Sequence, residues 1–404
     1  MAEKKRKDIC LMYAAGPGDV VKTFQSWNSG KEDLHQVAVT YSGQFFQACR
    51  ELGVRGVAVS SNPRIDTFKT DQFVVENRPK WSGGGEAQQA TGIKYHLQQL
   101  SYAKRLVQTA KKQRADVLIA AESTGHLFAL DWYSPGDLAI VPTIHCTLWP
   151  KFSPVSARQR LLNFFNRSLF TRRAPGILCI SEDIRSQLQL IGGNRLRPVH
   201  RFYPCYRRET FESIRKPVYY GNTFHILFAG RLEVNKGIFD LVEICTRLKG
   251  ECKNRIIWDI AGDGSQEDEL RRLVTERGIA DIFRVHGYCH RSKMLELIQN
   301  SHAFIVPTRM EFEEGFNKVV AESILNNRPV LTSAVCPAID DVRAAVVEAR
   351  PDNVDDYCRG VKRLVEDAAF YQEKVSACQT VQEQFYDQSN SWREKLKLVV
   401  EDIL

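Results

Sequence analysis

The sequence predicts an α/β fold with two doubly wound, Rossmann-like domains that face each other across a cleft. At 404 residues, the chain is too long for one ordinary hydrophobic core. Short apolar runs alternate with stretches of helical periodicity, which is the pattern of a parallel sheet covered on both faces. This alternation stops near the middle of the chain and then starts again, so we expect two sheets rather than one.

In the first half, apolar runs bounded by turn residues predict strands, and apolar residues at helical spacing predict helices. The predicted strands are residues 9–14, 36–39, 56–59, 117–120, 138–144 and 176–180. The predicted helices are residues 45–52, 92–113, 157–172 and 183–189.

Clusters of proline and charge at residues 201–208 and 215–217 break the periodicity and indicate a linker. We therefore expect a first domain over residues 1–210, a second over 211–380, and a C-terminal helix over 381–404 that returns toward the first. In the second half the predicted strands are residues 224–229, 256–261, 283–286, 303–306 and 329–332. The predicted helices are 238–249, 266–277, 292–299, 317–326 and a last helical segment over 367–404.

The composition is that of a soluble globular protein, with 43% hydrophobic and 26% charged residues. No stretch approaches the ~18 apolar residues of a membrane-spanning helix, and the apolar run at residues 9–15 is too short for a secretory signal. The 11 cysteines are odd in number and include no Cys-x-x-Cys pair. We expect them to be mostly small buried hydrophobes in a reducing cytoplasm.

Charge is distributed unevenly along the chain. Residues 1–210 carry 30 Lys and Arg against 17 Asp and Glu (+13), whereas residues 211–404 carry 26 against 31 (−5). A basic half favours an anionic partner, which could be a membrane surface, a lipid-linked diphosphate or nucleic acid. A solvated basic surface without a specific partner is the alternative. Residues 157–173 pose a similar choice, between a membrane-surface helix and an ordinary amphipathic helix packed on its sheet.

Two carboxylates flank a glycine-containing loop in the second half. Glu314 lies on the loop and Glu322 on the helix that follows a short buried strand, and a helix N-terminus so placed favours an anion. If Glu314 stood at the first helical position, a rise of about 1.5 Å per residue would put Glu322 roughly 12 Å further along. That exceeds the ~5 to 9.5 Å of a glycosidase pair, so we expect the two acids to grip different parts of one elongated ligand. In the alternative, Glu314 complements the helix dipole and Glu322 is a solvated helix residue.

Other candidates follow the ends of predicted strands. Arg231 and Lys236 lie between a buried strand and a helix, where two cations could stabilise a leaving diphosphate without a metal. Either residue alone is more often a surface charge. His145 ends a first-half strand and would face the cleft, although a lone histidine is more often structural. Glycines that allow a ligand close to the backbone, or that simply make turns, follow several strands, at Gly16, Gly18, Gly230, Gly262 and Gly287.

Taken in their order along the chain, these signals resemble the family 4 glycosyltransferases of the GT-B fold, which are retaining enzymes that use nucleotide sugars. The resemblance is strong over residues 226–330. It is fainter over residues 9–205, where it rests on the glycine loop, on His145 and on residues 176–181.

The resemblance implies a role for each matching residue. Arg231 and Lys236 would hold the donor diphosphate, Glu314 the donor sugar and Glu322 the ribose hydroxyls, while His145 would lie beside the sugar from the opposite domain. The implied catalytic residues are Glu314, His145, Arg231 and Lys236. The implied donor-binding residues are Gly16 and Gly18 near the phosphates, Gly287 and Tyr288 with their backbone at the base, Gly315, Phe316 and Asn317 at the sugar, and Glu322. Gly230 and Gly262 complete this donor-binding set.

The sequence departs from this family at three places. The usual Glu-Gly-Phe-Gly ends in Asn317, which adds a side chain near the sugar and would alter donor choice. Cys336 and Pro337 replace a common Gly-Gly turn, which puts that loop's contacts in doubt. Asn327 takes the place of a glycine frequent before Arg-Pro-Val.

We therefore expect a retaining hexosyltransferase of polysaccharide biosynthesis that uses neither a metal nor a cofactor, because the nucleotide-diphosphate sugar is a substrate. Its acceptor would be a glycan or lipid-linked precursor, and its location the cytoplasm, in contact with the inner face of the membrane. One rival is transfer to nucleic acid, against which few aromatic residues interleave with the basic ones. Another is a non-catalytic module that binds a sugar nucleotide or a partner protein, against which four charged site residues stand together.

Overall fold

A computed structural model describes residues 6–31, 37–80, 92–122, 124–134, 136–217 and 223–403. The chain divides into two compact units. The first comprises Met1–Leu148, Val155–Cys205 and Gln388–Leu404, and the second comprises Trp149–Pro154 and Tyr206–Asp387. Each unit is built around its own mainly parallel sheet, so the predicted α/β class is confirmed.

The first unit contains an eight-stranded sheet in the order β3-β4-β2-β1-β5-β6-β7-β8. All of its strand pairs are parallel except β3 with β4. Chain connections run outward from β1 in both directions, as in a doubly wound sheet. The strands are β1 (Cys10–Ala14), β2 (Arg55–Ser60), β3 (Asp66–Lys69), β4 (Phe73–Asn77), β5 (Val117–Ala121), β6 (Ala139–Ile144), β7 (Ile177–Cys179) and β8 (Val199–Arg201).

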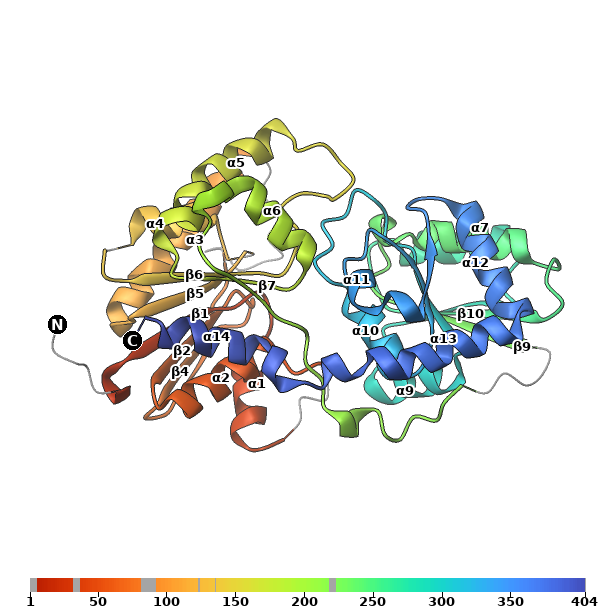
Figure 1. The fold of residues 1–404 in the computed structure, drawn as a ribbon, viewed down its shortest axis with the longest axis horizontal. Coiled ribbons are helices and arrows are strands. Elements are labelled where there is room, and N and C mark those ends of the chain that lie inside the picture. Colours follow the sequence, from red (N-terminus) through yellow and green to blue (C-terminus); the bar gives the residue numbers. More distant parts are fainter. Residues whose placement is uncertain are drawn as a thin grey trace. The chain divides into compact units, whose positions relative to one another are not determined.

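Helices cover both faces of this sheet (Figure 1). One face carries α1 (Val20–Asn28), α2 (Tyr41–Leu52) and the C-terminal α14 (Trp392–Glu401). The other carries α3 (Gly92–Gln113), α4 (Leu127–Tyr133), α5 (Ala157–Ser168) and α6 (Glu182–Gly192).

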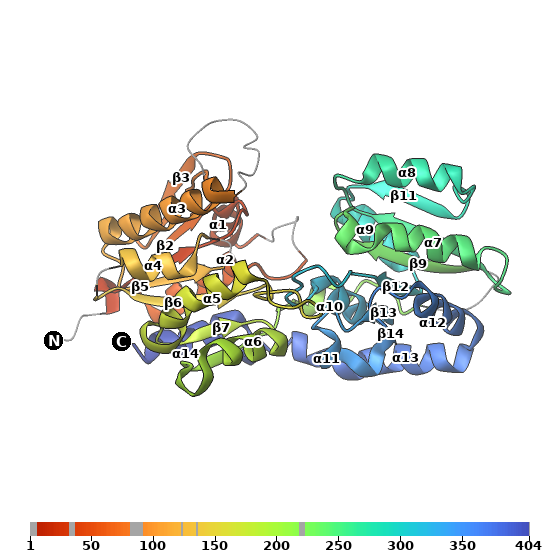
Figure 2. The same ribbon diagram turned by 90° about the horizontal axis from the view of Figure 1, so that it is seen from above.

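The second unit contains a six-stranded, fully parallel sheet in the order β11-β10-β9-β12-β13-β14. Figure 2 shows α7 and α8 beside β9–β11, with α10 to α13 around β12–β14. The strands are β9 (Thr223–Ala229), β10 (Arg255–Ala261), β11 (Phe283–Gly287), β12 (Ala303–Val306), β13 (Val330–Ser333) and β14 (Val346–Ala349). The helices are α7 (Ile238–Leu248), α8 (Glu267–Glu276), α9 (Arg291–Asn300), α10 (Lys318–Leu325), α11 (Ile339–Val342), α12 (Val354–Glu366) and α13 (Ala368–Val381).

Two predicted elements are wrong. Residues 37–39 of the expected strand 36–39 are not a strand, and Gln36 lies outside the described residues. This segment instead leads into α2, whose N-cap Thr40 accepts a hydrogen bond from the Gly43 N–H. The predicted helix over 367–404 is broken between α13 and α14, where the chain passes from the second unit to the first and Ser391 caps a new helix.

A buried arginine ties together three loops of the second unit. The Arg328 side chain is fully buried, and its guanidinium donates to the carbonyl oxygens of Ser301 (3.2 Å), Arg215 (2.8 Å) and Gln299 (3.3 Å), and to that of Asn326. Burial lowers the pKa of Arg328 to about 10. These carbonyls would lose their donors if the guanidinium were removed.

We expect Arg328→Met to destabilise the protein by about 3 kcal/mol, because it leaves several buried carbonyl groups without a hydrogen-bond donor. The loss is measured as a change in the free energy of unfolding, from the transition of the second unit during chemical denaturation. The matched control is Arg359→Met, at a side chain that is 66% exposed in a surface ion pair, which should cost no more than about 0.5 kcal/mol. Equal losses in the two variants would contradict the structural role of Arg328.

Candidate functional site

The carboxyl ends of β9, β10 and β11 are joined by backbone hydrogen bonds between their terminal residues. The Gly230 N–H donates to the Ala261 carbonyl (3.0 Å), and the Gly262 N–H donates to that of Gly287 (2.8 Å). Gly262 has a φ of +137°, and a Cβ atom there would lie 1.8 Å from the Gly230 carbonyl oxygen. Close backbone packing therefore requires Gly262 to be glycine, whether or not a ligand approaches it.

Two predicted cations meet over one aromatic ring beyond the end of β9. Lys236 Nζ lies 3.8 Å from the centroid of the Phe312 ring, and Arg231 Cζ lies 5.8 Å from it. Arg231 is exposed, whereas the Lys236 side chain is only 14% exposed. The next residue, Gly237, has a φ of +75° and fits against the Pro307 carbonyl, so the loop has little room to move Lys236 elsewhere.

Lys236 and Glu314 form an ion pair, with 2.7 Å between Nζ and Oε2, although 78 residues separate them in the sequence. The Glu314 side chain is 11% exposed. The same Oε2 accepts a hydrogen bond from Asn317 Nδ2 at 3.1 Å. The structure thus brings two of the predicted catalytic residues and one predicted donor-binding residue into direct contact.

Glu314 lies on the loop before α10, which begins at Lys318. The helical rise therefore does not set the distance between Glu314 and Glu322. Gly315 and Phe316 on this loop are buried, and the Phe316 ring packs against that of Phe385 with 6.1 Å between centroids.

Asn317 occupies the N-cap position of α10 with a φ of +66°, and Asn327, which follows the same helix, has a φ of +56°. Asparagine is among the few residues other than glycine that adopt this left-handed conformation readily. The two departures from the family's glycines therefore keep the backbone conformation that glycine would provide. Asn317 adds one amide group, which contacts the Glu314 carboxylate.

Glu322 is half-buried on α10 and has a side-chain partner within the second unit. The Tyr206 hydroxyl donates to Glu322 Oε1 at 3.4 Å. Burial raises the pKa of Glu322 to about 7, against the smaller opposing effects of Lys318 and of the Tyr206 hydrogen bond. Protonation of this carboxyl near neutral pH is therefore linked to the stability of the second unit.

The end of β11 is fixed by a charge cluster that the sequence did not predict. The Asp259 carboxylate contacts His286 Nε2 at 2.8 Å and His225 Nδ1 at 3.2 Å. Hydrogen bonds from these two histidines lower the pKa of Asp259 despite its burial. His286 directly precedes Gly287, whose φ is +68°, and Tyr288, whose side chain is 58% exposed. The predicted base-binding backbone thus follows a residue held in place by Asp259.

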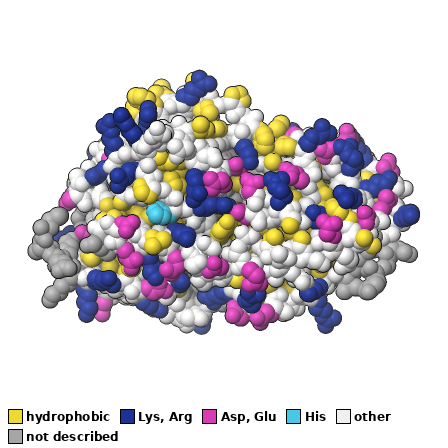
Figure 3. Space-filling view, viewed as in Figure 1, with side chains coloured by type: hydrophobic (Ala, Val, Ile, Leu, Met, Phe, Trp, Pro, Cys, Tyr) yellow, Lys and Arg dark blue, Asp and Glu magenta, His cyan; other side chains and the backbone are white. Residues whose placement is uncertain are grey.

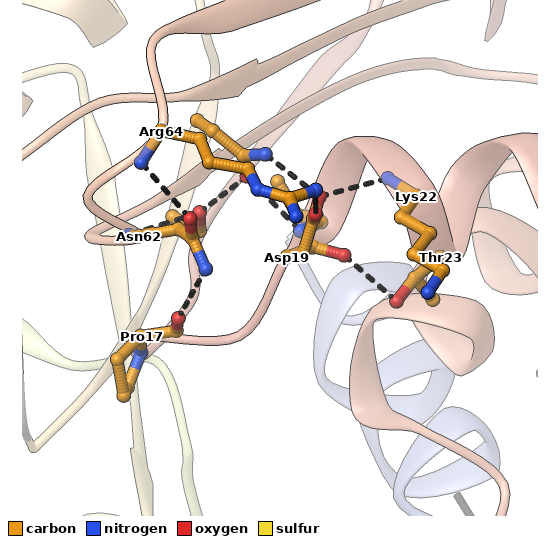
Figure 4. A network of polar contacts seen from close by, with 9 residues as sticks. Pro17, Asp19, Lys22, Thr23, Asn62 and Arg64 are labelled. Atoms are coloured by element: carbon orange, nitrogen blue, oxygen red, sulfur yellow. Dashed lines mark hydrogen bonds and ion pairs between the residues drawn. The ribbon is translucent and has the colours of Figure 1, made fainter. Parts of the chain in front are cut away.

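In the first unit, the glycine loop after β1 is held by polar contacts to neighbouring strands. Asn62 Nδ2 donates to the Pro17 carbonyl at 2.9 Å, and Asp19 caps α1 while pairing with Arg64 at 2.8 Å (Figure 4). Gly18 has no heavy atom within 4 Å of the position that a Cβ would take. The protein's own packing therefore does not require glycine at position 18.

His145 lies one residue beyond β6, half-buried between aromatic rings. Its ring centroid is 4.4 Å from that of Tyr41, and its Nε2 lies 2.9 Å from Thr143 Oγ1. Thr143 Oγ1 also accepts from the indole N–H of Trp392, on α14, at 2.9 Å. The C-terminal helix thus belongs to the structure around His145.

Glu122, just after β5, is a titratable group near His145 that sequence analysis missed. Its Oε2 accepts the His145 backbone N–H at 3.0 Å. Burial raises the pKa of Glu122 to about 7, although hydrogen bonds from His145 and Cys146 oppose this. The only sequence signal for Glu122 was that it directly follows the apolar strand β5, as the glycine loop follows β1.

Two further findings concern the described residues as a whole. No helix in the ranges that the structure describes is long and apolar enough to cross a membrane. In the same ranges, no group of three or more His, Cys, Asp or Glu side chains is arranged to hold a metal ion.

We expect Glu322→Gln to change how stability depends on pH. In wild type the pKa of Glu322 is about 7, against an ordinary glutamate pKa of 4.5, so the folded state keeps this proton and stability falls as pH rises through that interval. Glutamine removes this loss, so the variant should gain about 3 kcal/mol relative to wild type between pH 4 and pH 8. Denaturant unfolding at several pH values measures the difference. Glu366→Gln, at an exposed position, should keep the wild-type profile, and a pH-independent difference for Glu322→Gln would contradict the assignment.

Residues 209–379 match the family described as Glycosyl transferases group 1. A glycogen synthase of Mycobacterium tuberculosis (strain CDC 1551 / Oshkosh) is 23% identical over 333 residues, covering 80% of this chain and 75% of that protein.

Solved structures resemble the whole chain at low sequence identity. Sucrose-phosphate synthase from Thermosynechococcus elongatus superposes with a TM-score of 0.68, 14% identity and 98% coverage of both chains. HepE from Anabaena, in complex with UDP, gives a TM-score of 0.66 at 15% identity, covering 98% of this chain and 99% of that one. These likenesses establish the GT-B fold. Within that fold, residues 209–379 are the part that matches the glycosyl transferases group 1 family.

Proposed function

We propose that the protein is a retaining glycosyltransferase that moves a sugar from a nucleoside-diphosphate sugar to a hydroxyl acceptor. The observation that carries this proposal is the contact of Lys236 with Glu314 beside Arg231, at the carboxyl edge of the second sheet. The match of residues 209–379 to a glycosyltransferase family supports it, as does the UDP bound in the structurally similar HepE.

In this proposal the second unit binds the donor. The Arg231 guanidinium and the Lys236 ammonium bind the diphosphate oxygens, because a planar fork and a compact charge both suit phosphate. The Glu314 carboxylate accepts hydroxyls of the donor sugar, with the backbone of residues 315–317 beside it. Glu322 accepts the ribose hydroxyls, and the base lies against the backbone of Gly287 and Tyr288.

The ion pair between Lys236 and Glu314 is compatible with both the free site and the donor-bound site. Without a ligand, each side chain offsets the desolvation of the other, since both are largely buried. A diphosphate adds negative charge beside Lys236, and the Glu314 carboxylate then has capacity left for sugar hydroxyls, because one carboxylate has about four acceptor sites.

The chemistry needs positioning and charge stabilisation more than a strong base. The bond between the anomeric carbon and the diphosphate oxygen breaks, and its electron pair leaves with the diphosphate. The acceptor hydroxyl attacks from the same face and passes its proton to the departing oxygen, which retains configuration. No residue acts as nucleophile, and neither a metal nor a cofactor takes part in this scheme.

The acceptor belongs to the first unit in this proposal, where His145 lies beside the transferred sugar and Gly16 and Gly18 line the phosphate side. A lipid-linked or other glycan precursor at the cytoplasmic face of a membrane fits the basic first half of the chain. Transfer to nucleic acid and a non-catalytic binding module remain the rival functions. Incorporation of sugar into DNA, with affinity falling steeply as salt rises, would favour the first rival.

We expect Glu314→Gln to reduce slow hydrolysis of the preferred nucleotide sugar by about 100-fold or more, because a group aimed at the reacting sugar is lost. Lys236→Ala should instead weaken the thermal stabilisation that the nucleotide sugar gives, because a diphosphate contact is removed. Glu311→Gln, at an exposed side chain close by on the same loop, is the control and should resemble wild type. Donor binding without hydrolysis in every variant, wild type included, would favour the binding module.

Gly18→Ala tests whether a ligand approaches the first unit's glycine loop. A methyl group there meets no protein atom within 4 Å, so the variant should unfold like wild type, yet it should lower kcat/KM by about 10-fold if substrate phosphates lie against that position. Gly136→Ala is a matched control, because its Cβ position is equally open. If Gly18→Ala has the same kcat/KM as wild type, the substrate does not contact this loop.

A further inference from the structure

A second group of cationic residues lies at the carboxyl edge of the first sheet. Arg78 and Lys80 directly follow β4, and His126 follows β5. Helix α3 connects these two parallel strands, so its N-terminal end starts from the same edge. Arg105 lies past the middle of α3 and reaches the segment after β4 through a hydrogen bond to the Lys80 carbonyl. We name this group the Lys80 cluster. Its members are Arg78, Lys80, His96, Tyr102, Arg105, His126 and Arg158.

Two of the cations lie over one tyrosine ring, and a third bonds to the same helix. Lys80 Nζ lies 5.6 Å from the centroid of the Tyr102 ring, and Arg105 Cζ lies 5.3 Å from it. The Arg105 guanidinium donates to the Lys80 carbonyl. Arg78 Nη2 donates to Thr109 Oγ1 at 3.1 Å, on the turn of α3 after Arg105. These bonds fix the three cations close together.

Two histidines and an arginine extend the cluster toward α5. His96 Nδ1 and His126 Nε2 are 2.9 Å apart, and their rings stack with 5.1 Å between centroids. Arg158 Cζ lies 5.4 Å from the centroid of the Tyr95 ring, which contacts both histidine rings. At least one cluster histidine is therefore neutral, since one ring nitrogen must accept the proton that the other donates.

The cluster has more positive than negative charge in a partly buried place. Burial lowers the pKa of Lys80 to about 8, and burial followed by His96, Arg158 and Lys80 lowers that of His126 to about 4. Burial and the neighbouring Arg78 lower the pKa of Arg105. Each of these shifts is one that a bound anion would reverse.

Few described groups offset this charge. Glu76 Oε1 lies 3.7 Å from Arg78 Nε, whereas Arg105 and Arg158 make no ion pair within the described ranges. The Tyr102 side chain is fully buried, and across the same ranges its hydroxyl has no hydrogen-bond partner. A buried donor without a partner is uncommon in native structures, and the Tyr102 hydroxyl can donate to an oxygen of a bound anion.

We propose that the Lys80 cluster binds a phosphoryl group, carried by the acceptor. Arginine guanidinium groups bind phosphate oxygens in pairs, and lysine adds a point charge. A phosphate dianion would offset the charges of Arg105 and Arg158, and the Tyr102 hydroxyl would donate to one of its oxygens. The description of the ligand as an acceptor rests on the proposed function, but the binding of the phosphoryl group does not.

The phosphoryl group can come from a soluble phosphate ester or from a lipid headgroup. Figure 3 shows Lys and Arg side chains among hydrophobic ones on the surface of the first unit. The helices that carry the cluster also expose apolar side chains, namely Ile93 (79%) and Leu97 (60%) on α3 and Leu161 (57%) and Phe164 (70%) on α5. Both sources present phosphate oxygens to Lys80, as a dianion in a phosphate monoester and as a monoanion in a phosphodiester headgroup.

Titration of the full chain with inorganic phosphate, in the absence of nucleotide sugar and at constant ionic strength with chloride as the balancing anion, tests the site. Wild type should bind phosphate, and Lys80→Met should bind it at least about 10-fold more weakly, because a charge-assisted hydrogen bond is lost. Lys80→Arg should recover most of the affinity. Lys112→Ala removes an exposed lysine at the other end of α3 and should leave phosphate binding unchanged.

Arg158→Gln gives a second variant, at an exposed position on α5 that the fold does not depend on, and it should weaken phosphate binding in the same direction. The site is refuted if phosphate binds no better than chloride, or if Lys80→Met and Lys112→Ala weaken binding equally. Failure of the proposed glycosyl transfer would leave this phosphate result intact, so the two hypotheses fail separately.

Vesicles distinguish the two sources. Binding to phosphatidylcholine vesicles that contain phosphatidylglycerol, lost in Lys80→Met and kept in Lys112→Ala, would assign the phosphoryl group to a lipid. Equal vesicle binding by both variants, with phosphate binding lost only in Lys80→Met, would assign it to a soluble phosphate ester.

Discussion

The candidate donor site depends on how closely the carboxyl ends of the second unit's strands approach one another. Gly262 lies so near the Gly230 carbonyl that no side chain fits between them, and its N–H bonds to Gly287. The loops that carry Arg231 and Tyr288 therefore start from fixed, adjacent points. In a parallel sheet, every such loop emerges at the same edge, so side chains distant in sequence converge there without any further device.

Much of this arrangement could be predicted from the sequence because it follows from local patterns. Buried strands followed by glycine turns placed Arg231, Lys236 and His145 at strand ends, where the structure has them. The ion pair between Lys236 and Glu314 could not be predicted, because 78 residues separate the partners. Glu122 and Asp259 were missed for the same reason. Each lies at or within an apolar strand, and its partners come from other strands.

Short or irregular elements also could not be predicted from the sequence. β3 and β4 form an antiparallel pair at the edge of the first sheet, with too few residues for a clear period. The break between α13 and α14 reflects a passage between units, which helical periodicity does not record. Asn317 and Asn327 looked like departures from a glycine pattern, yet both have the positive φ that glycine would supply. Residue identity alone overstated that difference, since asparagine can adopt the left-handed conformation in which glycine is common.

The bond from the Trp392 indole to Thr143 has a consequence for biosynthesis of the chain. Residues 388–404 belong to the first unit, whereas 206–387 form most of the second. A ribosome releases the chain from the N-terminus, so the first unit stays incomplete until the whole of the second has emerged. The unit that begins synthesis first is thus the last to be finished, and a pause within residues 206–387 would leave the surroundings of His145 without α14.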